Sequence, residues 1–131
     1  MTTIVLAHAG TDDRRMYAEY LRAHGFRVKE AETTDAALPK LAECQLLITG
    51  LLVPGSFDGV ELIRRARARN ASLPILVVTA CGVERIRNDA RTAGCNELLL
   101  KPCFPEQVIK TVWHLLDTPH ERRRMLVRAQ R

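Results

Sequence analysis

Residues 46–59 read LLITGLLVPGSFDG, an apolar run that reaches Gly50 and continues through a loop with proline and glycine into an amphipathic stretch. Residues 46–48 are apolar throughout, as expected for a strand that is buried on both faces of a parallel sheet. In open parallel α/β sheets the chemistry lies just beyond the carboxyl ends of the strands. Here a residue without a side chain holds that place, so the segment predicts a site scaffold that lacks its reactive group.

Length and composition describe one globular domain. The chain has 131 residues, of which 47% are hydrophobic and 27% charged, values that exclude general disorder and fit a single core. The apolar runs have the length of strands rather than of membrane spans, and the Met1 end lacks the basic and apolar regions of a signal peptide. We therefore expect a cytoplasmic location and no contact with a membrane.

The positive charge is concentrated at one end of the chain. The formal net charge is +5, and residues 119–131 hold five arginines and one glutamate, which leaves +1 for residues 1–118. The sequence thus predicts a nearly neutral domain over residues 1–118 and a basic C-terminal tail or extra helix over residues 119–131.

Strand-length apolar runs alternate five times with stretches of helical period, a pattern typical of βαβ units and a parallel sheet. Thr11 is a candidate N-cap for the first helix, with Met16, Tyr20 and Leu21 facing inward, and Pro39 is expected to kink or delay the second. The predicted strands cover residues 4–7, 27–31, 45–49, 75–79 and 98–100, and the helices cover residues 12–24, from 34 onward, 59–70, 83–93 and 106–116. The fold class is α/β with three layers.

Several short motifs occur in order along this alternation. They are Gly25-Phe26, Pro54 with Asp58-Gly59, Leu73-Pro74, Thr79-Ala80, Ala93-Gly94 and Lys101-Pro102. With these motifs, residues 3–117 resemble a response-regulator receiver domain (CheY-like) of two-component signalling. The resemblance implies a doubly wound, flavodoxin-like (βα)5 fold with strand order 2-1-3-4-5 and a cis peptide bond before Pro102.

The resemblance also implies a particular chemistry. In this family an aspartate after the third strand accepts a phosphoryl group from a histidine kinase, and an acidic pair after the first strand helps to hold Mg²⁺. Counting from the motifs puts Gly50 at the acceptor position, His8 and Ala9 at the acidic pair, and Leu98 at the aromatic switch. Only Thr79 and Lys101, with Pro102, keep the phosphate-binding half of the pocket.

These departures identify the chain as a degenerate or pseudo-receiver without enzymatic activity, for which Mg²⁺ binding is not expected. We expect it to act through phosphorylation-independent contact with a sensor kinase, a phosphotransfer protein or an effector. The candidate partner surfaces are Arg14, Arg15 and Ala18 on the first helix, and Arg87, Arg91 and Lys110 on the helix 4, strand 5 and helix 5 face, through which the chain could also form a homodimer.

Other interpretations stay open at this stage. The pocket around Thr79 and Lys101, with His8, could bind a small anion or metabolite, and the arginine tail could contact nucleic acid, although no base-reading motif accompanies it. His8, Cys81 and Cys103 could form a metal or redox site, but inert cysteines are commoner and no metal site is predicted. Asp12 and Asp13 are interpreted as first-turn helix acids, and Asp58 as a turn residue.

Overall fold

The computed structural model describes residues 1–117, so the predicted basic tail at residues 119–131 lies outside the described part. Five strands alternate with five α-helices and one short 3₁₀ helix. The elements are β1 (Thr3–Ala7), α1 (Thr11–Ala23), β2 (Arg27–Ala31), α2 (Thr34–Lys40), η1 (Leu41–Glu43), β3 (Leu46–Thr49), α3 (Gly59–Arg69), β4 (Ile75–Thr79), α4 (Glu84–Ala93), β5 (Glu97–Leu100) and α5 (Pro105–Asp117).

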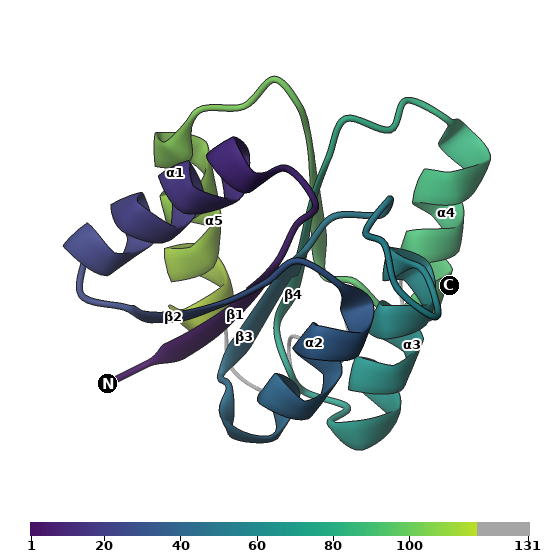
Figure 1. Cartoon of the computed structure of the whole chain (residues 1–131), viewed down its shortest axis with the longest axis horizontal. Helices are drawn as coiled ribbons and strands as arrows, with labels where there is room; N and C mark the ends of the chain where they lie inside the picture. The colour runs from purple at the N-terminus through teal and green to yellow at the C-terminus, as the bar shows by residue number, and fades with distance from the viewer. Residues whose placement is uncertain (118–131) are drawn as a thin grey trace.

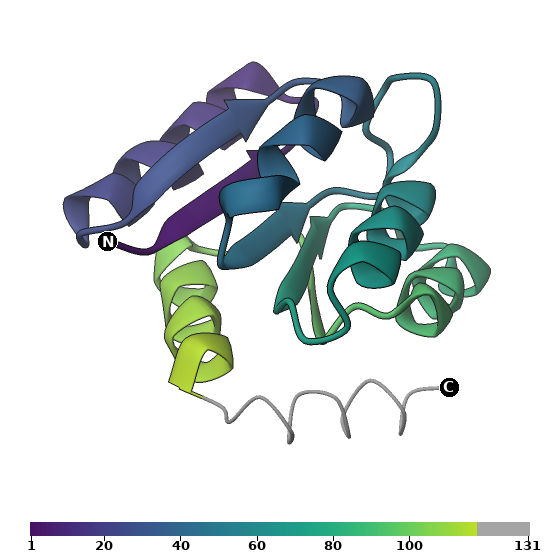
Figure 2. The same cartoon turned by 90° about the horizontal axis from the view of Figure 1, so that it is seen from below.

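The strands form one parallel sheet in the order β2-β1-β3-β4-β5, which confirms the predicted fold class and topology. Helices α1 and α5 lie on one face of the sheet, and α2, α3 and α4 lie on the other (Figure 1). Helices α3 and α4 are neighbours, as the turned view in Figure 2 also shows. No helix within residues 1–117 is long and apolar enough to cross a membrane.

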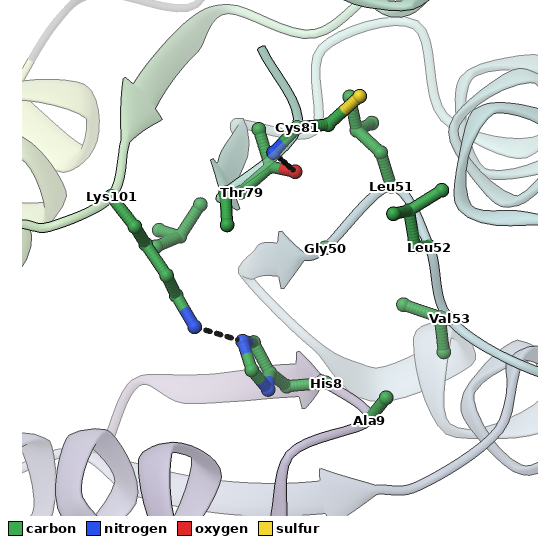
Figure 3. A pocket seen from close by; sticks show the side chains of 11 residues that line it. His8, Ala9, Gly50, Leu51, Leu52, Val53, Thr79, Cys81 and Lys101 are labelled. Carbon is green, nitrogen blue, oxygen red and sulfur yellow. Dashed lines mark hydrogen bonds between the residues drawn. The ribbon is translucent and has the colours of Figure 1, made fainter.

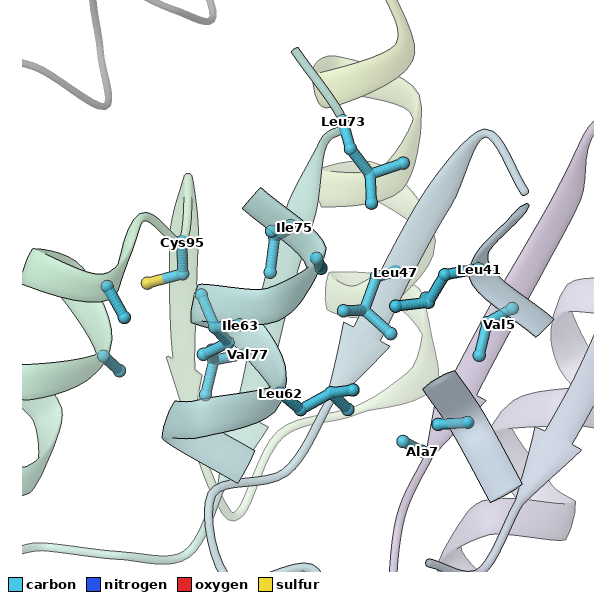
Figure 4. Packing of buried hydrophobic residues seen from close by; sticks show 14 of the residues in the cluster. Val5, Ala7, Leu41, Leu47, Leu62, Ile63, Leu73, Ile75, Val77 and Cys95 are labelled. Atoms are coloured by element: carbon cyan, nitrogen blue, oxygen red, sulfur yellow. The ribbon is translucent and has the colours of Figure 1, made fainter. Parts of the chain in front are cut away.

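The core consists of two apolar layers, one on each face of the sheet. Along β1, Val5 and Ala7 face the layer under α2, α3 and α4 (Figure 4), whereas Ile4 and Leu6 face the layer under α1 and α5. Strand side chains alternate between the two faces, and every residue of β1, β3 and β4 is buried. The three central strands are therefore packed on both faces, and this packing fixes the positions of their carboxyl ends.

Local capping explains the beginning of α3 and the end of α4. The Asp58 carboxylate accepts a hydrogen bond from the Glu61 N–H and caps α3, and Gly94 ends α4 with a φ of +118°, a conformation that glycine adopts easily. The expected N-cap of α1 is wrong, because Gly10 holds the cap position and Thr11 is already helical. Pro39 lies inside the short α2, which gives way to the 3₁₀ turn η1.

The predicted inward face of α1 is partly wrong. Met16 is 42% exposed and Tyr20 is only half-buried, whereas Tyr17 and Ala18 are buried together with Leu21. The buried face of α1 also includes Arg14. Because this residue is charged, it interrupts the helical pattern of apolar residues in the sequence. In the last turn of α5, Leu115 is buried and Leu116 is half-buried.

The backbone just after β3 lies very close to the backbone of the first turn of α3. The Gly59 N–H donates to the Leu51 carbonyl at 3.1 Å, which brings the first turn of α3 onto the end of β3. A Cβ at residue 59 would lie 2.2 Å from the Gly50 oxygen and 2.8 Å from the Leu51 Cα. Only glycine fits here without a backbone shift.

We expect Gly59→Ala to lower the free energy of unfolding by about 1–3 kcal/mol, because the added methyl group overpacks rigid backbone. Urea denaturation followed by circular dichroism measures the loss. Gly82→Ala is the matched control, since a Cβ there meets nothing within 4 Å, and it should cause no loss. Equal midpoints for the two variants would contradict the close-approach explanation.

Candidate functional site

The candidate site lies at the carboxyl edge of the sheet, where four strand ends meet. His8 follows β1, Gly50 follows β3, Thr79 ends β4 and Lys101 follows β5. They line one cavity of about 170 Å³ with Ala9, Leu51, Leu52, Val53, Val78, Ala80 and Cys81 (Figure 3). The structure therefore brings together five of the predicted site positions, namely His8, Ala9, Gly50, Thr79 and Lys101.

Lys101 is the centre of the polar contacts in this cavity. Its ammonium nitrogen lies 2.6 Å from His8 Nε2 and donates to Asp13 Oδ2 of α1 at 2.6 Å. The Lys101 side chain is 16% exposed, whereas that of Asp13 is 52% exposed. The hydrogen bond from Lys101 lowers the pKa of Asp13. Lys101 thus obtains its counter-charge from outside the cavity, and Asp13 has a role beyond the first-turn interpretation.

His8 is held in place by its neighbours on every side. Its Nδ1 accepts from the Gly10 N–H at 3.0 Å, its own N–H donates to the Ala31 carbonyl, and its carbonyl accepts from Arg14. Burial, followed by the positive charge of Lys101, lowers the pKa of His8 below its ordinary value of 6.5. The ring is therefore neutral near pH 7.

None of the residues that line the cavity has a carboxylate. Mg²⁺ takes hard oxygen ligands, usually from one or two carboxylates, so this lining does not fit the ion. The nearby acids have other contacts, since Asp13 pairs with Lys101 and Asp58 caps α3. Within residues 1–117 no group of three or more histidine, cysteine or acidic side chains could hold a metal ion.

The two cysteines of the metal or redox hypothesis have separate surroundings. Cys81 is buried and lines the cavity, and its N–H donates to Thr79 Oγ1 at 3.0 Å. Cys103 lies beside Tyr17, whose hydroxyl is 3.5 Å from the Cys103 sulfur. Burial raises the pKa of Tyr17, so this hydroxyl remains protonated. Sequence reasoning missed Tyr17, although its spacing of four residues from Leu21 was a signal.

The expected cis peptide bond joins Lys101 to Pro102. Three residues before Lys101, Leu98 of β5 is half-buried against the apolar layer under α2, α3 and α4. It has no polar group with which to report on the cavity.

The predicted partner surface on α1 is wrong at two of its three positions. Arg14 is 4% exposed and Ala18 is fully buried, so neither can meet a partner. The Arg14 guanidinium pairs with Glu30 and Glu32 and also donates to the His8 carbonyl at 3.0 Å. Arg15 is exposed as predicted. On the other surface Lys110 is exposed, and Arg87 and Arg91 are half-buried.

A five-stranded parallel sheet of order 2-1-3-4-5, with a lysine and a threonine at its carboxyl edge, has the flavodoxin-like arrangement that receiver domains share with other doubly wound α/β proteins. The chain belongs to the response regulator receiver domain family, whose pattern matches residues 8–113. It is therefore a CheY-like receiver domain of two-component signalling.

Individual relatives agree with this assignment. The transcriptional regulatory protein ResD of Bacillus subtilis is 35% identical over 105 residues, which cover 79% of this chain but 43% of ResD. The response regulator receiver protein CpdR of Brucella abortus is 29% identical over 131 residues, which cover 98% of this chain and all of CpdR. A CheY-like receiver from Methanospirillum hungatei shares the fold, with a TM-score of 0.84 at 20% identity over 89% of this chain and 94% of that one.

The contacts of Arg14 predict a large effect of its removal. Arg14→Ala leaves the partly buried His8 carbonyl without its donor and removes one of the two arginine partners of Glu30, and we expect a loss of about 1–3 kcal/mol in the free energy of unfolding. The exposed neighbour supplies the control, because Arg15→Ala should stay within about 0.5 kcal/mol of the wild type. Thermal unfolding of both variants tests the difference, and comparable losses would refute it.

The contribution of Lys101 to the lowered pKa of His8, which is smaller than that of burial, predicts a titration. Since Lys101 lowers the pKa of His8, Lys101→Met should raise it, whereas Lys110→Met on α5 should leave it unchanged. Because the folded-state pKa lies below 6.5, protonation favours the unfolded chain, and wild-type stability should fall as the pH drops below that value. NMR titration of the His8 ring gives the pKa directly, and a value above 6.5 in the wild type would be inconsistent with this account.

Proposed function

We propose that this receiver domain signals through protein contact without being phosphorylated. The observation that carries the proposal is that β3 is followed by Gly50, in a cavity whose lining has no carboxylate. The family's chemistry needs an aspartate at this point to form an acyl phosphate. A glycine has no side-chain atom that could accept the phosphoryl group.

The surroundings of Gly50 support the same conclusion about the metal. The family's acidic pair falls on His8 and Ala9, where an imidazole nitrogen accepts from Gly10 and a methyl group lines the cavity. Neither side chain offers the oxygen ligands that Mg²⁺ requires. We therefore assign no role to Mg²⁺ and no enzymatic activity to the domain.

The remaining parts of the pocket have structural contacts instead. The Thr79 hydroxyl oxygen accepts the Cys81 N–H, and Lys101 joins the end of β5 to α1 through Asp13. Leu98 packs into the core in place of an aromatic reporter. The domain in this proposal presents one fixed arrangement of its surfaces rather than two that alternate with phosphorylation.

In this proposal partner proteins bind to the surfaces of the domain. Arg15 on α1 offers a contact for a sensor kinase or a phosphotransfer protein, and Lys110 with Arg87 and Arg91 offers one for an effector or for a second copy of the chain. The half-exposed side chains Leu100 and Trp113 add apolar area on β5 and α5, which favours contact with protein.

The direct test is incubation with acetyl phosphate and Mg²⁺ followed by intact mass measurement. We expect no gain of a phosphoryl group by the wild type. A stable gain would overturn the proposal, and mapping the modified residue would show which side chain had taken the role of the acceptor.

The matched positive control is the Gly50→Asp, Ala9→Asp double variant. A Cβ at residue 50 would meet Val53 Cγ2 at 3.4 Å and the Val78 oxygen at 3.7 Å, which are distances the fold tolerates. This variant restores an acceptor and one acidic ligand beside Thr79 and Lys101. It should gain one phosphoryl group under the conditions in which the wild type gains none.

A further inference from the structure

The cavity at the carboxyl edge of the sheet is lined mainly by apolar groups. Six of its eleven lining residues have aliphatic side chains, and Gly50 has no side chain (Figure 3). The aliphatic residues are Ala9, Leu51, Leu52, Val53, Val78 and Ala80. Pockets that bind small molecules typically combine such a lining with a few polar groups. The lining therefore favours a ligand that is mostly apolar.

The charged group of the lining already has partners. The Lys101 ammonium donates to Asp13 Oδ2 and is hydrogen-bonded to His8 Nε2, with both distances at 2.6 Å. His8 Nδ1 accepts from the Gly10 N–H, so both nitrogens of this ring are bonded as well. An anion that approached Lys101 would have to compete with Asp13, whereas an uncharged molecule leaves these bonds intact. The polar contacts therefore favour an uncharged ligand.

Gly50 leaves room at the centre of the lining. A Cβ at residue 50 would lie 3.4 Å from Val53 Cγ2 and 3.9 Å from His8 Cδ2, and both of these residues line the cavity. A side chain at this position would therefore begin inside the cavity. The volume of about 170 Å³ is close to that of an engineered apolar cavity of about 150 Å³ that binds benzene.

Leu52 adds apolar surface at the entrance to the cavity. It is 70% exposed, whereas Leu51 and Val53 on either side of it are buried. A molecule seated in the cavity would cover part of this leucine, and the removal of apolar area from water is favourable. The exposed leucine thus contributes to the binding of an apolar molecule and not to that of an ion.

We propose that this cavity binds a free, uncharged apolar molecule of about the size of benzene. The molecule packs against Leu52, Val53 and Val78, beside the backbone of Gly50. Its binding requires no metal ion, no phosphoryl transfer and no protein partner. The site therefore goes beyond the proposed function, and the two can fail separately.

NMR titration without Mg²⁺ tests the site with two molecules of similar shape. Toluene is uncharged, and benzoate carries a carboxylate in place of the methyl group. We expect toluene to cause saturable shifts of the methyl signals of Leu51, Val53 and Val78, while those of Leu115 on α5 stay in place. Benzoate and inorganic phosphate should bind at least tenfold more weakly. A tenfold increase in sodium chloride should not weaken the binding of toluene.

A variant with a smaller cavity supplies the matched control. Gly50→Leu places an apolar side chain in the same space and should abolish the binding of toluene. Lys110→Leu adds the same side chain at an exposed position of α5 and should leave the binding unchanged. Should Gly50→Leu fail to fold, the methyl signals of the wild type and the comparison of toluene with benzoate decide.

Four results would overturn the proposal. They are the absence of saturable shifts with toluene, binding of benzoate as tight as that of toluene, tighter binding of phosphate than of toluene, and undiminished binding of toluene by a folded Gly50→Leu variant.

Discussion

A parallel sheet brings the carboxyl ends of all its strands to one edge, and the site of this protein depends on that constraint. Residues that are far apart in the chain, such as His8 and Lys101, meet because β1 and β5 run in the same direction in one sheet. The three central strands are buried on both faces, so their ends cannot shift along the strand direction without disturbing two apolar layers. The geometry of the cavity is thus a property of the core.

The polar contacts in the cavity follow from the position of the negative charge. With no carboxylate in the lining, the Lys101 ammonium extends to Asp13 on α1 and passes beside His8 on the way. A buried cation requires a partner, and here the partner lies on a helix rather than at a strand end. The contact therefore links the loop after β5 to the first turn of α1.

The fold could be predicted from the sequence because its signals are local. The alternation of apolar runs with helical periods predicts the elements, and the family resemblance that the ordered motifs carry implies the strand order and the cis bond at Pro102. Thr79 and Lys101 were placed in the cavity by the same motifs. The predicted loss of phosphoryl chemistry rests on the identity of Gly50 and stays a prediction.

Two of the errors concern charged residues whose partners are distant in the sequence. Arg14 was assigned to the surface because guanidinium groups are mostly exposed, yet Glu30, Glu32 and the His8 carbonyl together satisfy it in a buried position. These partners come from β2, the loop after it and the loop after β1, and no spacing along α1 reveals them. The Lys101–Asp13 pair was missed for the same reason, since its residues are 88 positions apart.

The contacts of Arg14 also determine how a displacement of the loop after β1 would be transmitted to the edge strand β2. The Arg14 side chain joins α1, the edge strand β2 and the backbone of His8. Any displacement of the loop after β1 must either carry this guanidinium along or break its bond to the His8 carbonyl. The edge of the sheet at β2 is therefore mechanically coupled to the cavity, on the opposite side from α4 and β5.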